Sequence, residues 1–456
     1  MSHQSSRRQF IKKAGAATAA GVGFWVTGKQ DPWAQEKGPN AKLNVASIGT
    51  GGQGGHDMGA VGGSENIVAL CDIDSKRNDE AGKKYPEAKK YSDYRKMLEE
   101  MAPKIDAVTV GTPDNHHACA SVRAMKLGKG VYTEKPMTHD VYEARVMRET
   151  ANKYKVATQM GNQGTSGGNL RKAVEIIQSG GLGEVTEAHI WTNRPIWPQS
   201  PNITARPKES PVPENIDWDN WIGPAPMRPH ATNYLHFKWR GWWDFGTGAL
   251  GDMACHTANL PFMALKLGAP TSVEAESEPP NPETCPGWAK VTYMFPAREG
   301  MPACKVIWYE GKRKGEKGEE KLLPPLDLLM GEKVSDSASL IIGSKGSMYS
   351  PDDYGAKSTW LPKDKLTPEW LKEFKPTVKL PSSPGHHAEW IRACKGGEPA
   401  MSNFNYAGPL TEFVLLGNVA IRAQKKLEWD SVNLKATNCP EADPYIKREY
   451  RKGWSL

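Results

Sequence analysis

The chain has 456 residues, a formal net charge of +7 at pH 7, 38% hydrophobic residues and 24% charged residues. This composition is that of an ordinary globular protein, and the length predicts about three domains, or two large ones. The scattered basic residues form no nucleic-acid-binding module, and the seven cysteines, odd in number and without a C-x-x-C pair, fit neither a disulfide framework nor a zinc site.

The N-terminus carries SRRQFIK at residues 6–12, which fits the bacterial twin-arginine export pattern. The apolar run over residues 14–28 is rich in Ala and Gly and is too short to span a bilayer stably. The alternative is a disordered basic tail, which is less favoured because Phe10, Ile11 and the apolar run are in register. We therefore predict a signal and linker over residues 1–38, a periplasmic or other extracytoplasmic location, and no stable membrane span.

A dinucleotide-binding domain is predicted over residues 40–160. Short apolar strands are expected at 43–49, 66–74, 106–111, 130–134 and 155–160. Helical stretches lie between them, at 91–101, 117–127 and 140–153. Strands that alternate with helices indicate a parallel sheet with helices on both faces, so the fold class is α/β with an N-terminal Rossmann domain.

The turn after the first strand, GTGGQG, places Gly49, Gly51 and Gly54 in the positions of the dinucleotide fingerprint. These glycines allow a tight turn, a close approach of backbone to pyrophosphate, and packing of the next helix on the strand. The second strand leads to Asp72, near the spacing of a carboxylate that binds the ribose hydroxyls. Because this acid repels a 2′-phosphate, we predict NAD as the cofactor, with NADP less favoured.

The segment directly after the glycine turn, GHDMGAVGG, is a poor helix former, so its helix must be short or held by packing.

The pattern changes over residues 161–456. A helix is expected at 170–179, a strand at 184–192, a passage rich in Pro and Trp to about residue 248, and a helix at 250–267. Strands at 271–278, 288–295, 303–310, 339–343 and 346–350 have no helices between them, and the charged stretch 311–321 is expected to end a hairpin. Residues 387–424 are expected to be helical in two pieces, and the end of this stretch is expected to pack back on the first domain. We predict an α+β domain for substrate binding and oligomerisation, with a large, mostly antiparallel sheet.

Two motifs follow strands at the carboxyl edge of the predicted parallel sheet, where ligands bind. In Glu134-Lys135-Pro136, a partly desolvated lysine would have a lowered pKa and could transfer a proton. A surface lysine at a strand end is the simpler interpretation of that motif alone. The motif TPDNHH (residues 112–117) would cover the nicotinamide half of a cofactor, and its Asp or Asn could also cap a helix.

A third motif, GALGDMACH, places Asp252 and His256 four residues apart, so they share one face of a helix. A carboxylate and an imidazole on one face can bind a substrate hydroxyl and relay its proton. They could also ligate a metal, but the further ligands it needs are missing apart from His386 and His387, and we predict no metal site. An ordinary pair on a helix face is the remaining interpretation.

Residues of the Trp-rich passage could line the cleft, because indole faces suit the apolar faces of sugar rings. Most of the 16 tryptophans are nevertheless expected to pack in cores and domain interfaces. The rim candidates are Trp191, Asn193, Arg194, Trp197, Trp239, Arg240, Trp242 and Trp243.

Together these motifs resemble those of the glucose–fructose oxidoreductase, inositol dehydrogenase and rhizopine-catabolism family (Gfo/Idh/MocA). The resemblance covers about residues 42–430 and rests on IGTGGQGG, CDID, TPDNHH, EKP, GALGDMACH and PLTEFVLLGNVAIRAQKKLEWD. The passage from WDNWIGPAP to GALGDMACH is similar to that of an exported, twin-arginine branch. The resemblance implies an NAD-dependent oxidoreductase that takes a hydride from a sugar or polyol carbinol. We also expect a homo-oligomer.

The resemblance further implies roles for single residues. Lys135, Asp252 and His256 would be catalytic, with His256 the favoured base and Lys135 orienting the hydroxyl, although members of the family differ in the base they use. The bond between Lys135 and Pro136 is expected to be cis. The predicted cofactor-binding residues are Gly49, Gly51, Gly54, Asp72, Thr112, Pro113, His117, Glu134, Lys135 and Gln159.

Export constrains the chemistry, because free NAD is a cytoplasmic compound. An exported enzyme must carry its NAD bound and reoxidise it in place. We therefore predict hydride transfer between a sugar or polyol hydroxyl and tightly bound NAD. The first alternative is a redox-neutral glycoside hydrolase or lyase, in which transient oxidation acidifies a neighbouring C–H bond. The second is a non-catalytic binding protein, which would have no need of Lys135, Asp252 and His256 together.

Overall fold

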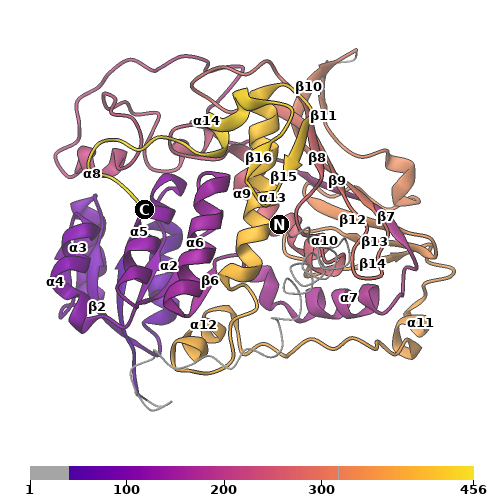
Figure 1. Ribbon diagram of the computed structural model, residues 1–456, viewed down its shortest axis with the longest axis horizontal. Helices are drawn as coiled ribbons and strands as arrows, with labels where there is room; N and C mark the ends of the chain where they lie inside the picture. Colours follow the sequence, from indigo (N-terminus) through magenta and orange to yellow (C-terminus); the bar gives the residue numbers. More distant parts are fainter. Residues whose placement is uncertain (1–40, 317) are drawn as a thin grey trace, which may run out of the picture.

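The computed structural model describes residues 41–316 and 318–456, which form a parallel-sheet domain and a second domain with a larger sheet (Figure 1). The predicted export signal over residues 1–38 lies outside the described residues. No helix in the described part of the chain is long and apolar enough to cross a membrane.

The N-terminal sheet is parallel, with the strand order β3-β2-β1-β4-β5-β6, which confirms the predicted Rossmann arrangement. The strand order reverses between β1 and β4, and a ligand crevice opens at such a point. Strand β3 was not predicted from the sequence, because it is short and carries two lysines. The strands are β1 Asn44–Ile48, β2 Asn66–Cys71, β3 Lys89–Tyr91, β4 Ala107–Val110, β5 Gly130–Thr133 and β6 Thr158–Met160.

Helices pack against both faces of this sheet (Figure 1). The glycine-rich α2 has ten residues and is held by packing, with Met58 and Val61 buried. A Cβ atom on Gly54 would lie 2.4 Å from the carbonyl oxygen of Gly49, so only glycine allows α2 to approach the β1 turn this closely. The helices are α2 Gly52–Val61, α3 Ser75–Lys84, α4 Tyr94–Met101, α5 Asp114–Lys126 and α6 Val141–Tyr154, with a 3-10 turn at Ala102–Lys104.

The second sheet has ten strands in the described residues, in the order β14-β13-β12-β7-β10-β9-β8-β15-β16, with β11 paired to β10. Its pairs are antiparallel except for β7 with β10, which confirms the mostly antiparallel prediction. The β10–β11 pair is the hairpin expected at 311–321. The strands are β7 Val185–Thr192, β8 Ser272–Ser277, β9 Trp288–Phe295, β10 Cys304–Gly315, β11 Gly318–Lys321, β12 Ala338–Gly343, β13 Gly346–Ser350, β14 Thr359–Leu361, β15 Leu427–Asp430 and β16 Lys435–Ala436.

The helix predicted at 250–267 is two helices, α9 and α10, separated at Ala258. Pro261 lacks the N–H that would continue the hydrogen bonds of α9. Helix α9 therefore ends at Thr257, and α10 begins at Asn259. The helices of this part are α7 Gly168–Gln178, α8 Trp218–Ile222, α9 Gly248–Thr257, α10 Asn259–Ala264, α11 Pro368–Glu373, α12 His386–Cys394, α13 Phe404–Ala423 and α14 Asp443–Ile446, with 3-10 turns at Gln163–Ser166, Lys238–Gly241, Leu326–Leu329 and Pro440–Ala442.

The C-terminal helices join the two domains, as expected. Helix α13 lies between them, against α6 of the first domain and α9 and β8 of the second (Figure 1). Helix α12 packs on α2 and β6, and its Trp390 is fully buried beside Tyr132 of β5. The predicted boundary at residue 160 places α12 in the second domain, although this helix packs on the first domain.

Two further segments cross the carboxyl edge of the parallel sheet. We call residues 193–247 the insertion and residues 447–456 the C-terminal tail. The insertion pairs with the first domain through backbone bonds from Ser75 to Asn215 and from Asp217 to Ile73. The tail joins the insertion where Arg451 N donates to the Pro224 carbonyl oxygen. Both segments therefore lie over the edge where the predicted cofactor would bind.

Candidate active site

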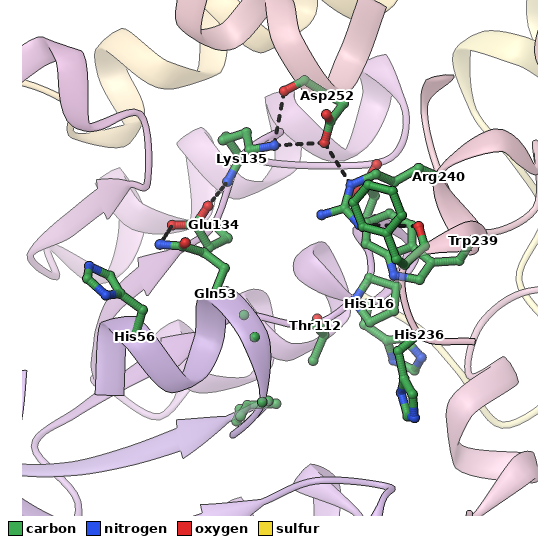
Figure 2. A pocket seen from close by; sticks show the side chains of 18 of the residues that line it. Gln53, His56, Thr112, His116, Glu134, Lys135, His236, Trp239, Arg240 and Asp252 are labelled. Carbon is green, nitrogen blue, oxygen red and sulfur yellow. Dashed lines mark hydrogen bonds and ion pairs between the residues drawn. The ribbon is translucent and has the colours of Figure 1, made fainter. Parts of the chain in front are cut away.

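A cleft of about 910 Å³ runs along the carboxyl edge of the parallel sheet, within the usual size range of ligand sites. It is lined by the glycine turn, Asp72, the end of β5, α9 and the insertion. Gln53, His56 and Glu134 lie on one side of it, and Trp239, Arg240 and His236 on the other (Figure 2). Of the predicted site residues, those that line the cleft are Gly49, Gly51, Asp72, Thr112, Pro113, Glu134, Lys135, Asp252 and His256.

The glycine turn fits the pyrophosphate of a dinucleotide. Gly49 has a positive φ of 86°, and a Cβ atom there would lie 2.5 Å from the Gly111 carbonyl oxygen. Gly52, at the start of α2, has no atom within 4 Å of its Cβ position, so the cleft is open beside it. No side chain caps this end of α2, which leaves its first N–H groups facing the cleft. Exposed N–H groups at a helix start bind phosphate groups well.

Asp72 stands at the end of β2 beside this turn. Its Oδ2 accepts hydrogen bonds from Thr50 N at 2.8 Å and from Thr50 Oγ1 at 3.2 Å. Its Oδ1 accepts from Asp74 N at 3.0 Å. The carboxylate is thus fixed at the lip of the cleft, where the ribose hydroxyls of NAD would reach it.

Three predicted cofactor-binding residues do not line the cleft. His117 is buried, with Nδ1 2.8 Å from the Pro136 carbonyl oxygen and Nε2 2.8 Å from that of Thr112, so it joins two loops behind the site. Gln159 is buried and donates to the His386 carbonyl oxygen at 2.8 Å. Gly54 lies at the contact of α2 with the turn. In this structure all three support the cleft without facing it.

At the inner end of the cleft, Lys135 and Arg240 share one carboxylate. Lys135 Nζ lies 2.8 Å from Asp252 Oδ1 and 3.0 Å from the Asp252 carbonyl oxygen. Arg240 Nε lies 2.9 Å from the same Oδ1 (Figure 2). The bond between Lys135 and Pro136 is cis, as the resemblance implied. The structure therefore brings the EKP motif, the GALGDMACH motif and the insertion together at one point.

This ion pair overturns the expectation of a lowered lysine pKa. Burial lowers the pKa of Lys135, but the charge and hydrogen bond of Asp252, together with the charge of Glu134, outweigh it, and the pKa lies above its ordinary value. Burial raises the pKa of Asp252, but Lys135 and Arg240 together hold it well below its usual range. At neutral pH the resting site therefore holds an ammonium and a carboxylate.

His256 lies on α9 one turn after Asp252, as predicted, and it is buried. Burial, and then the charge of Lys135, lower the pKa of His256 to about 3. Its ring stands edge-on to Tyr354 at 4.9 Å between centroids, and its Nδ1 is buried without a hydrogen-bond partner among the described residues. His256 is therefore neutral at neutral pH, and one of its ring nitrogens is not used by the protein.

Glu134 belongs to a second buried cluster, on the α2 side of the cleft. Its Oε1 lies 3.5 Å from Gln53 Nε2 and 3.3 Å from Gln163 Nε2, and Gln53 also reaches Asp57 at 3.1 Å. Burial and then Asp57 raise the pKa of Glu134 to about 8, and burial raises the pKa of Asp57 to about 7. His387 Nε2 lies 3.0 Å from Asp57 Oδ1, so this histidine is a hydrogen-bond partner of the buried Asp57 carboxyl group.

The rim candidates divide between cleft and core. Arg194, Trp197, Trp239 and Arg240 line the cleft. Trp191, Trp242 and Trp243 are buried in hydrophobic clusters, which agrees with the expectation for most tryptophans. Asn193 is exposed and bonds to Arg194.

Several residues that line the cleft were not predicted from the sequence. Tyr354 comes from a turn after β13, His236 from the insertion, and Trp454 from the tail. Gln53 and His56 lie on the first turns of α2, where the glycine pattern could have pointed to them (Figure 2). The other three are far apart in sequence, and no local spacing relates them to the glycine turn.

Comparison with known proteins agrees with this geometry, which is that of a nucleotide-binding α/β protein with a cluster of charged side chains at the inner end of its cleft. Residues 43–162 match the profile described as "Oxidoreductase family, NAD-binding Rossmann fold". Residues 170–319 match "Oxidoreductase family, C-terminal alpha/beta domain". The chain belongs to the Gfo/Idh/MocA family of NAD-binding oxidoreductases.

Individual relatives are distant. A "Glycosyl hydrolase family 109 protein" of Solibacter usitatus is 30% identical over 200 residues, which are 40% of this chain and 44% of that protein. The chain thus matches less than half the length of this curated relative. The WlbA dehydrogenase from Bordetella pertussis, solved with NADH and UDP-GlcNAcA, is 15% identical with a TM-score of 0.58, covering 86% of this chain and 99% of that chain. An aldose-aldose oxidoreductase from Caulobacter crescentus, complexed with glycerol, is 14% identical with a TM-score of 0.54, covering 85% and 100%.

Proposed function

We propose that this chain oxidises a hydroxyl group of a sugar or polyol with NAD held in the cleft. The observation that carries the proposal is the Lys135–Asp252 ion pair at the inner end of the cleft that the glycine turn also lines. When bound, NAD supplies the hydride acceptor. The sugar-like ligands named for the WlbA dehydrogenase and the aldose-aldose oxidoreductase support this substrate class.

Lys135 is placed to bind the reacting hydroxyl. An ammonium group has three N–H donors, and two of those of Lys135 point to Asp252. The third is left for the hydroxyl oxygen of a substrate, where it would stabilise a developing alkoxide. Two side chains can then take the hydroxyl proton. They are His256, which is neutral, and Lys135 itself, once it has given its own proton to water in the cleft.

We further propose that the protein is exported with NAD already bound and recycles it in place. The twin-arginine pattern at residues 6–12 supports export, and the insertion and the tail, which cross the carboxyl edge of the sheet, support retention of the cofactor. Retention over many turnovers requires a dissociation constant well below micromolar, which corresponds to about 10 kcal/mol or more of binding free energy.

The test is to purify the mature protein without added cofactor and to identify any nicotinamide that denaturation releases. The holoenzyme is then given glucose or myo-inositol together with a reducible sugar or aldehyde that can accept the hydride, or a nitrophenyl glycoside alone, with no free NAD, and product per enzyme is counted. We expect bound NAD and many turnovers without accumulating NADH. Turnover that stops at one equivalent and resumes only with added NAD would show an ordinary dehydrogenase that releases its cofactor.

The second candidate function is redox-neutral cleavage of a glycoside, in which the oxidised carbon acidifies its neighbour, a substituent leaves, and the hydride returns. The similarity to a protein named for glycosyl hydrolase family 109 favours it. Release of nitrophenol with no second substrate present would identify this reaction. Net oxidation of a free sugar that requires a second, reducible substrate would exclude it.

A further inference from the structure

Arg240 is held firmly in its place beside the ion pair. Its guanidinium stacks on Trp239 at 4.3 Å and on Phe237 at 4.8 Å, and its Nε lies 2.9 Å from Asp252 Oδ1. The residue belongs to the insertion, and neither the EKP motif nor the GALGDMACH motif includes it. A second cation on an oxygen that Lys135 already neutralises needs an explanation, because one ammonium group is enough to pair one carboxylate.

The explanation lies in the state of Lys135 during proton transfer. A neutral amine is needed before Lys135 can take a proton from a substrate hydroxyl. If Lys135 were the sole partner of Asp252, losing its proton would leave a buried carboxylate unpaired, which is costly. With Arg240 on the same oxygen, the carboxylate stays paired when Lys135 becomes neutral. The charge of Arg240 also lowers the pKa of Lys135, in opposition to Asp252.

We infer that Arg240 is a positioning residue which keeps Asp252 paired so that Lys135, rather than His256, can act as the base in the proposed reaction. Lys135 first gives one proton to cleft water and then receives the proton of the substrate hydroxyl on Nζ. The inference rests on the proposed function and settles which of its two candidate bases acts. Charged and titratable groups that act on Lys135 from the surrounding elements are Asp252, Arg240, Glu134, Asp114, His117, Cys255, His256 and Tyr354.

The test is the pH profile of bound-NAD reduction in a single turnover of the holoenzyme, with whichever sugar, polyol or nitrophenyl glycoside of the panel reduces it. The rate needs neutral Lys135, so it rises with pH through the pKa of that amine. Arg240→Gln removes a positive charge close to Lys135, and we expect the rising limb to move to higher pH by about one unit or more. Arg240→Lys keeps the charge and should restore most of the wild-type profile.

The matched control is Arg206→Gln, which removes an arginine of the same insertion that is exposed and pairs with Glu283. It should leave the profile where it is. A folded, NAD-loaded Arg240→Gln protein whose rising limb does not move, or moves to lower pH, would overturn the inference.

A second measurement does not need a substrate. The rate at which Lys135 is acetylated by acetic anhydride, followed by peptide mass spectrometry over a range of pH, reports the titration of its amine. We expect its midpoint to rise in Arg240→Gln and to stay unchanged in Arg206→Gln. If no probe reduces the bound NAD, the proposed function fails, and this measurement still decides whether Arg240 controls the proton of Lys135.

Discussion

The side chain of Lys135 meets two opposing physical effects, and the ion pair with Asp252 decides the outcome. Burial alone would neutralise the amine, whereas the carboxylate at 2.8 Å keeps it charged at rest. The lysine is therefore ready to bind a hydroxyl oxygen but must lose a proton before it can accept one. This requirement makes the neighbouring charges as important as the lysine itself.

Replacing Lys135 by Ala should leave the fold and the bound NAD in place while lowering turnover by about 10²- to 10⁴-fold, the usual contribution of a general acid or base. Asp252 keeps Arg240 as a partner in this variant, so no buried carboxylate is left unpaired. NAD content after denaturation and the single-turnover rate are the measurements. A near-wild-type rate in the loaded variant would remove Lys135 from the catalytic group.

Replacing Asp72 by Ala should weaken NAD by about tenfold or more, because hydrogen bonds to a charged group contribute roughly 1.5–3 kcal/mol each. NADP should lose less, since the acid repels a 2′-phosphate. Titration of the apoprotein with each dinucleotide measures the difference. Thr50→Val is the control, since it removes the hydroxyl that contacts Asp72 but keeps the carboxylate. Equal losses for both cofactors would assign Asp72 a structural role in the turn.

At the scale of single elements, the central strands of the second sheet carry a buried acid that the site does not use. Glu310 lies on β10 between β7 and β9, is 2% exposed, and accepts a hydrogen bond from Trp308 Nε1 at 2.8 Å. Burial raises the pKa of Glu310 to about 8 from 4.5. The strand therefore favours the neutral acid, and ionisation of this group opposes folding.

The sign of the resulting pH effect follows from this raised pKa. The contribution of Glu310 is fully present below pH 4.5 and is lost as the pH rises through about 8. Glu310→Gln should therefore have a free energy of unfolding that falls less steeply between pH 5 and 8, by up to about 1.4 kcal/mol per pH unit. Urea unfolding at several pH values measures it. Glu274→Gln, at an exposed position of β8, is the control, and identical slopes in wild type and Glu310→Gln would contradict the prediction.

At the scale of the whole molecule, the C-terminal tail holds the insertion and the first domain together over one end of the cleft. Trp454 is buried between His116 at 5.6 Å and Tyr94 at 5.9 Å, with the guanidinium of Arg95 4.0 Å from its ring centroid. Arg451 Nε donates to the Gly223 carbonyl oxygen of the insertion. These contacts connect the last residues of the chain to the wall of the cleft.

Replacing Trp454 by Ala should therefore speed the release of NAD by about tenfold, which corresponds to about 1.4 kcal/mol, while the chemical step changes little. Loss of bound NAD during dilution and gel filtration measures the release rate. Lys452→Ala, at an exposed position of the same tail, should release NAD at the wild-type rate. Equal release rates in the two variants would show that the tail does not retain the cofactor.

The local pattern was enough to predict the parallel sheet, the glycine turn and the position of Lys135 at the carboxyl edge of that sheet. Strand periodicity and turn residues act over a few positions, and parallel strands bring their carboxyl ends to one edge whatever follows them. Asp252 and His256 share a helix face because they are four residues apart. These features follow from neighbouring residues, which is why the sequence by itself determined them.

Only the tertiary structure decided what surrounds these side chains. Lys135 and Arg240, more than a hundred residues apart, contact the same oxygen of Asp252, and Trp454 reaches the cleft from the end of the chain. His117 and Gln159 were predicted to bind the cofactor but are turned to backbone carbonyls behind the cleft. The pKa of Lys135 has the opposite shift from that expected, because the charge and hydrogen bond of Asp252 from the second domain, with the charge of Glu134, together outweigh burial. Burial and charge depend on contacts between distant segments, and such contacts leave no periodicity or spacing in the sequence.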